Sequence, residues 1–238
     1  MSSQLETKQG VAAGFVTYPG AKGQLQGYLA RPSDSKSYPG VILVQEWWGI
    51  EPHIKQLTER LAREGFVVLA PDLYHGRVAK EPSDAEKEMM ALNKQAAVEE
   101  ITRAIAYLQG RDDVSPKKLG MTGFCMGGFL TWLTAEATNG QLAAIAPFYA
   151  GFYEPTVEDI RRVSAPVLAV WGSEDASIPA EARDHIVSLL EQEGKTFKAL
   201  VLDAPHAFMN DTRPRYRKEA ADEAWKELVA WLDHYLRA

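Results

Sequence analysis

Short, mostly apolar runs recur along the chain and are separated by segments with helical periodicity. The six runs have the length of strands buried on both faces; they are Val41–Val44, Val67–Ala70, Leu119–Thr122, Ala144–Ala146, Val167–Val170 and Ala199–Leu202. Between them, apolar residues recur three and four positions apart, as in the set Ile54, Leu57 and Leu61, the set Val98, Ile101, Ile105 and Leu108, and the set Ile186, Leu189 and Leu190. This alternation favours an open, mainly parallel sheet with helices on both faces.

The two ends of the chain carry different patterns. Residues 15–18 and 25–30 alternate apolar and polar positions around a turn-prone Pro19-Gly20 segment, which predicts an antiparallel hairpin and brings the expected sheet to about eight strands. Residues 216–236 predict an amphipathic last helix with one core-facing stripe. We expect a single α/β domain over residues 1–238, with residues 1–13 poorly ordered or extended.

Composition narrows the functional classes. The 238 residues carry a formal net charge of -6, so no global positive field favours nucleic acid. The N-terminus has no apolar signal segment, and no stretch approaches the roughly 20 apolar residues of a membrane helix, so we expect a cytoplasmic protein without a membrane partner. One cysteine excludes an internal disulfide and a C-x-x-C metal or redox site. We expect no metal and either a monomer or a small homo-oligomer.

That cysteine lies in the most informative segment of the chain. Gly123-Phe124-Cys125-Met126-Gly127 joins a predicted strand to a predicted helix. Glycines two positions before and after Cys125 permit a sharp turn that lifts a nucleophile out of the sheet. The turn also places the sulfur at a helix N-terminus, where free N–H groups favour the thiolate. The alternative is a buried, inert cysteine.

A nucleophile of this kind is followed along the chain by an acid and then a histidine, each after a later strand. His206 follows the run ending at Leu202, whereas His185 and His234 lie in helical segments. The acid belongs between Cys125 and His206, where Glu174 and Asp175 follow a strand; we prefer Asp175. Asp72 also follows a strand but precedes the cysteine, so we interpret it as a loop or capping carboxylate.

An oxyanion hole needs two N–H donors, for which we propose the backbone N–H groups of Met126 and Trp47. Trp47 follows the first parallel strand beside Glu46 and Trp48. Core packing is an equally simple explanation of both tryptophans. Glu46 is harder to explain, because a carboxylate at the end of an apolar strand is costly unless it is paired.

These segments together resemble the dienelactone hydrolases (carboxymethylenebutenolidases). The resemblance extends over residues 14–236 and rests on five segments in order: Gln45–Gly49, Pro71–Tyr74, Gly123–Gly128, Gly172–Asp175 and His206–Phe208. It implies an α/β-hydrolase fold, a Cys125–His206–Asp175 triad, no cofactor and a small lactone or ester as substrate. It also implies that Glu46 meets the resting thiol and takes its proton when substrate arrives.

The resemblance is incomplete where the family binds the substrate carboxylate. Ala207 and Asn210 stand near the places of a serine and an arginine, which argues against dienelactone itself as the natural substrate. The segment 83–95 shows no arginine or tyrosine. Arg77 and the basic cluster of Arg213, Arg215, Arg217 and Lys218 could replace these anchors, although exposed surface charge is the simpler interpretation.

Side chains near the nucleophile suggest what the pocket accepts. Trp48, Phe124 and Phe208, with Trp47, favour an apolar or aromatic acyl group. Two other functions remain open on the same fold: a ligand-binding or redox-sensing module in which Cys125 is oxidised, and an acyltransferase that passes the acyl group to an acceptor other than water.

Overall fold

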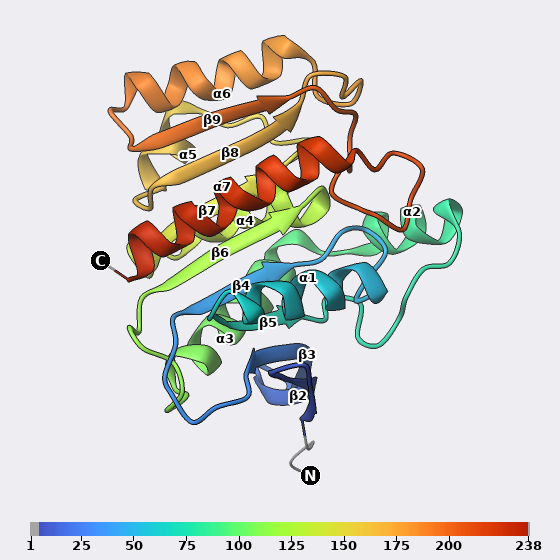
Figure 1. Cartoon of the computed structure of the whole chain (residues 1–238). Coiled ribbons are helices and arrows are strands. Elements are labelled where there is room, and N and C mark those ends of the chain that lie inside the picture. The colour runs from blue at the N-terminus through green and yellow to red at the C-terminus, as the bar shows by residue number, and fades with distance from the viewer. Residues whose placement is uncertain (1–4, 238) are drawn as a thin grey trace.

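The computed structural model describes residues 5–237 and contains a nine-stranded sheet in the order β1-β2-β3-β5-β4-β6-β7-β8-β9 (Figure 1). The strands are β1 Glu6–Lys8, β2 Val11–Gly20, β3 Gly23–Pro32, β4 Gly40–Val44, β5 Val67–Pro71, β6 Leu119–Phe124, β7 Leu142–Phe148, β8 Val167–Gly172 and β9 Phe197–Leu202. Strands β4 to β9 are parallel, and β3 joins them by pairing antiparallel with β5.

This arrangement confirms the predicted α/β class and the N-terminal hairpin, which β2 and β3 form with Gly20 opposite Gly23. The ninth strand is the three-residue edge strand β1, which pairs with the start of β2. Strand β1 and the first three residues of β2 fall within residues 1–13, of which residues 1–4 lie outside the described part. Every residue of β4, β5, β6 and β8 is buried, as continuous apolar runs require.

Residues 5–237 contain seven helices, of which the first six lie between strands and the last follows β9: α1 Pro52–Arg63, α2 Pro82–Ala91, α3 Lys94–Gln109, α4 Met126–Ala137, α5 Val157–Arg162, α6 Ala180–Gln192 and α7 Lys218–Leu236. Helices α1 and α7 share one face of the sheet, where the Arg60 guanidinium lies 3.9 Å from the centre of the Trp225 ring (Figure 1). Helices α3 and α4 pack together on the other face. None of these helices is both long and apolar enough to cross a bilayer.

Residues 83–95 contain the end of one helix and the start of the next. Helix α2 ends at Ala91, and the extended backbone of Leu92 separates it from α3. The Asn93 side chain then caps α3 by accepting a hydrogen bond from the Ala96 N–H at 3.0 Å. An asparagine cap satisfies a backbone donor that would otherwise be free, so it favours a new helix start here.

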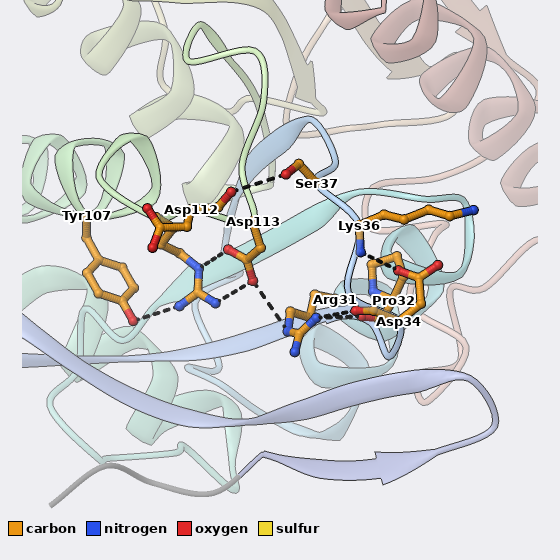
Figure 2. Close-up of polar contacts among 9 residues, drawn as sticks. Arg31, Pro32, Asp34, Lys36, Ser37, Tyr107, Asp112 and Asp113 are labelled. Carbon is orange, nitrogen blue, oxygen red and sulfur yellow. Dashed lines mark hydrogen bonds and ion pairs between the residues drawn. The ribbon is translucent and has the colours of Figure 1, made fainter.

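An ion-pair network holds the edge of the sheet at which the parallel strands begin (Figure 2). The Arg111 guanidinium donates two 2.7 Å hydrogen bonds to Asp113 and a third to the Tyr107 hydroxyl. Arg31, at the end of β3, reaches the same Asp113 carboxylate at 3.4 Å. Because this network ties the hairpin to the loop before β6, it stabilises the edge opposite the carboxyl ends of the strands.

Candidate active site

Cys125 lies at the carboxyl end of β6, directly before the first residue of α4. Its backbone has φ 55° and ψ -116°, a conformation that side chains rarely adopt. The Cys125 N–H donates to the Phe148 carbonyl, and its own carbonyl accepts from the Phe129 N–H, both at 3.1 Å. The turn is therefore held between the neighbouring strand and the new helix, and the side chain stands at the helix N-terminus.

The glycines on either side of this turn make it possible. A Cβ atom at Gly123 would lie 2.2 Å from the Gly127 carbonyl oxygen. A Cβ atom at Gly127 would lie 2.3 Å from the carbonyl oxygen of Val44 at the end of β4. Both distances are far below ordinary contact, so only glycine lets α4 approach the two strands this closely.

His206 and Asp175 come from the loops after β9 and β8, as the order of the segments predicts. His206 Nδ1 lies 2.6 Å from Asp175 Oδ2. The second Asp175 oxygen accepts a hydrogen bond from the Ser177 N–H at 2.9 Å, and the residue is only 4% exposed. Glu174 is exposed. Of the two adjacent acids, Asp175 alone contacts the imidazole.

The imidazole is strongly biased towards its charged form. Burial lowers the pKa of His206, but hydrogen bonds to Asp175 and Cys125, together with the charges of both partners, outweigh burial and raise the pKa to about 10. Cys125 is thus close enough to His206 to influence its pKa, and the contact with Asp175 is the hydrogen bond that the imidazole makes within residues 5–237.

Glu46 follows β4 and is 1% exposed. Its Oε1 accepts a hydrogen bond from the Tyr149 hydroxyl at 3.2 Å, and its Oε2 accepts one from Asn210 Nδ2 at 2.7 Å. Within residues 5–237, no hydrogen bond joins Glu46 to Cys125. The structure thus pairs the carboxylate, as its burial requires, but with an amide and a phenol instead of the expected thiol.

Tyr149 connects this carboxylate to the imidazole. Its ring centre lies 5.1 Å from that of His206, and its backbone has φ 34°. Burial, followed by the nearby charges of Glu46 and Cys125, raises the pKa of Tyr149 well above its usual value. The hydroxyl therefore stays protonated and donates to Glu46. Tyr149 was not among the residues predicted from the sequence, although its place directly after β7 was a usable signal.

Asn210 Nδ2 also donates to a second buried acid, Glu51, at 3.2 Å. Arg213 pairs with the other Glu51 oxygen at 2.9 Å, and its guanidinium carbon lies 3.8 Å from the centre of the Trp48 ring. Arg213 is therefore partly buried and paired, contrary to the expectation of free surface charge. Arg215, Arg217 and Lys218 are exposed as expected. The pairing of Glu51 was likewise not predicted from the sequence.

The two candidate oxyanion donors lie where their positions in the chain predict. Met126 is the first residue of α4, where backbone N–H groups lack helical acceptors. Trp47 follows β4, whose end packs on Gly127 of the same helix. Among residues 5–237, no backbone acceptor pairs with the Trp47 N–H.

The aromatic residues expected to line the pocket are mostly in the core. Phe124 and Phe208 have no exposed surface and pack against Tyr149, with ring centres 6.2 and 5.4 Å away. Because they are fully buried, they do not form an accessible wall; they pack behind Tyr149 instead. Trp48 is 7% exposed beneath Arg213, whereas Trp47 is half-buried.

Asp72 has the structural role expected of it. Its carboxylate accepts hydrogen bonds from the N–H groups of Tyr74 at 3.1 Å and Gly76 at 2.7 Å, which fixes the loop after β5. The Gln45 side chain accepts from Leu73 in the same loop. Across residues 5–237, no group of three or more His, Cys, Asp or Glu side chains is arranged to hold a metal ion.

The chain is similar to known proteins over most of its length. The model of the dienelactone hydrolase family matches residues 25–236. A Methylorubrum extorquens protein named "Putative carboxymethylenebutenolidase" is 33% identical over 95% of this chain and 82% of its own length. "Protein usf" of Aquifex pyrophilus is 35% identical over 90% of this chain and 94% of its own. A crystal structure titled "Putative Dienelactone Hydrolase" from Klebsiella pneumoniae superposes with a TM-score of 0.86 at 30% identity, covering 94% of this chain and 99% of that one.

Proposed function

Because the chain belongs to the dienelactone hydrolase family, we propose that it hydrolyses lactone or carboxylic ester bonds through an acyl-enzyme on Cys125. The observation that carries the proposal is the 2.6 Å contact between His206 and Asp175, together with Cys125 being one of the groups that raise the pKa of His206. The strained turn before α4 presents the sulfur at the end of this chain.

In the first half of the reaction, the Cys125 thiolate attacks the carbonyl carbon and forms a C–S bond. The carbonyl electron pair moves to oxygen, where the Met126 and Trp47 N–H groups stabilise the negative charge. When the tetrahedral intermediate collapses, the C–O bond breaks and the departing alkoxide takes a proton from the His206 imidazolium. A lactone leaves this step as an opened chain still attached to sulfur.

In the second half, the now neutral His206 removes a proton from water, and the resulting hydroxide attacks the thioester carbonyl. The C–S bond breaks, releasing the carboxylic acid and restoring the thiolate beside the imidazolium. Asp175 holds the imidazole in one orientation and stabilises its cation throughout. The Tyr149 hydroxyl donates to Glu46 and the Tyr149 ring packs on His206. We assign Glu46 the role of accepting the thiol proton when substrate arrives and of returning it to the thiolate after the acid product has left.

The test compares wild type with Cys125→Ala and His206→Ala, each checked for folding by circular dichroism, on p-nitrophenyl acetate. We expect both variants to lose at least about 100-fold in kcat/KM. Equal turnover by all three proteins would refute the proposal. Because the chain has one cysteine, mass spectrometry after acid quench gives an unambiguous second result: an acetyl group on Cys125 in wild type.

The same experiment addresses the two other functions. An acyltransferase would turn over in proportion to an added alcohol or amine acceptor. A redox sensor would show no turnover and would form only sulfenic acid on Cys125 after peroxide treatment.

A further inference from the structure

Two buried carboxyl groups that follow β4 share one amide from the loop after β9. Glu46 and Glu51 are 1% and 5% exposed, and Asn210 Nδ2 donates to both, at 2.7 and 3.2 Å. A neutral amide can satisfy the two acids by hydrogen bonding but cannot compensate their charge. The compensating cation is Arg213, which pairs with Glu51 alone. With both acids ionised, this cluster has one negative charge in excess.

The cluster is connected to the reacting groups by short links. Glu46 accepts from the Tyr149 hydroxyl, and the Tyr149 ring packs on His206. On the other side of His206, Asp175 adds a further buried carboxylate that the imidazolium balances. Buried charges are weakly screened by salt, so they act on a substrate over distances at which surface charges do not.

The cations around this site in the described part of the chain are held by other groups. The half-buried Arg183 donates to the carbonyls of Gly172 and Ile178, on either side of Asp175. The Arg213 guanidinium is held between Glu51 and the face of the Trp48 ring, and its Nε is enclosed. Arg77 pairs with Glu88 and its side chain is 66% exposed. Lys94 is exposed with its Nζ 4.8 Å from the centre of the Phe129 ring. Water screens both of these outer charges.

From this distribution of charge we infer that the substrate carries no ionised group next to its reacting carbonyl: the site accepts neutral esters or lactones and disfavours those bearing a carboxylate there. The inference rests on the proposed function for its reaction, but the charge around Cys125 can be measured without any turnover.

The first experiment uses alkylation of the single cysteine. Iodoacetamide and iodoacetate share a reacting carbon and a leaving group and differ in one negative charge. The alkylation ratio is the rate with iodoacetamide divided by the rate with iodoacetate. At neutral pH we expect this ratio to be about tenfold higher for Cys125 than for N-acetylcysteine amide. A ratio equal to or below that of the free thiol would overturn the inference.

Two variants change the net charge of the cluster of Glu46, Glu51 and Arg213 in opposite directions. Glu51→Gln removes one negative charge with little change of shape and should lower the ratio, whereas Arg213→Gln removes the only cation and should raise it. Glu191→Gln is the matched control, because it removes an exposed charge near the end of α6, at the opposite edge of the sheet. Unchanged ratios in both folded cluster variants would contradict the assignment. If one variant fails to fold, the other still tests whether the alkylation ratio moves in the direction that the change of charge predicts.

The second experiment applies the inference to substrates. γ-Butyrolactone-γ-carboxamide and the matching γ-carboxylate differ mainly in charge, and we expect at least a tenfold higher kcat/KM for the carboxamide. Equal rates, or a preference for the carboxylate that Lys94→Gln abolishes, would refute the inference and leave the hydrolase function standing. Selective alkylation without Cys125-dependent hydrolysis of either lactone would instead refute the hydrolase function alone.

Discussion

Gly172→Ala tests how closely the two loops of the proposed triad depend on one backbone contact. Gly172 is the last residue of β8, three positions before Asp175, and a Cβ atom there would lie 2.1 Å from the Ala204 carbonyl oxygen. That carbonyl accepts a hydrogen bond from Glu174 at 3.0 Å and lies two residues before His206. The added methyl group would therefore displace the backbone of the loop that carries Asp175 and of the loop that carries His206.

The expected loss of activity and stability follows from the overlap between the new Cβ atom and the Ala204 carbonyl oxygen. Relieving it requires the two loops to separate by about 1 Å, which breaks the 2.6 Å contact between His206 and Asp175. A misplacement of this size near reacting groups costs roughly 100-fold in rate. Overpacking of a closely packed backbone costs about 1–3 kcal/mol, which lowers Tm by about 2–4 °C per kcal/mol in a chain of this length.

The assay combines kcat/KM on p-nitrophenyl acetate with thermal unfolding. Gly110→Ala is the control, because Gly110 has an ordinary φ of -78° at the end of α3 and a Cβ atom there would meet nothing closer than 3.5 Å. We expect the control to keep wild-type activity. A folded Gly172→Ala protein with kcat/KM within twofold of wild type would refute the reasoning.

Three further predictions follow from the same structure. Since the pKa of His206 is raised from 6.5 to about 10, its stabilising contribution is fully present below pH 6.5 and is lost as pH rises to about 10; urea unfolding should show this loss in wild type and a flatter profile in His206→Gln. Glu46→Gln should slow thiolate formation without unfolding the protein, and an unchanged pH–rate profile would contradict the role of Glu46 as proton acceptor. Asp113→Asn should remove about 1 kcal/mol of stability by breaking the network of Figure 2 while kcat/KM stays at the wild-type value, so a lower kcat/KM would show that this edge affects the site.

The parts of the fold predictable from sequence are those with a local physical cause. Apolar runs predict buried strands because parallel strands covered on both faces need apolar side chains throughout. Glycines around Cys125 predict the sharp turn because a Cβ atom at either position would overlap backbone atoms. The break at Leu92 and the edge strand β1 were not predictable, because neither has a local pattern strong enough to distinguish it.

The hydrogen-bonded cluster around Glu46 lay beyond sequence reasoning for a different reason. Asn210 is 164 positions away from Glu46 in the chain, and the contact exists only because the loops after β4 and β9 meet at the same edge of the sheet. The cost of burying an unpaired carboxylate predicts that Glu46 has a partner, but not which one. The partners proved to be an amide and a phenol.

Chain order alone does not distinguish Glu174 from Asp175 as the acid that orients His206, whereas side-chain geometry does. Both acids follow β8, but Asp175 is buried with its two oxygens on His206 and the Ser177 N–H, whereas Glu174 is exposed. Asp175→Asn keeps the shape but offers the imidazole an amide, so we expect kcat to fall roughly 100-fold or more. Glu174→Gln, its matched neighbour, should stay within twofold of wild type. Steady-state kinetics with the two folded variants decides the matter: a larger loss from Glu174→Gln than from Asp175→Asn would mean that the carboxylate orienting His206 has been misassigned.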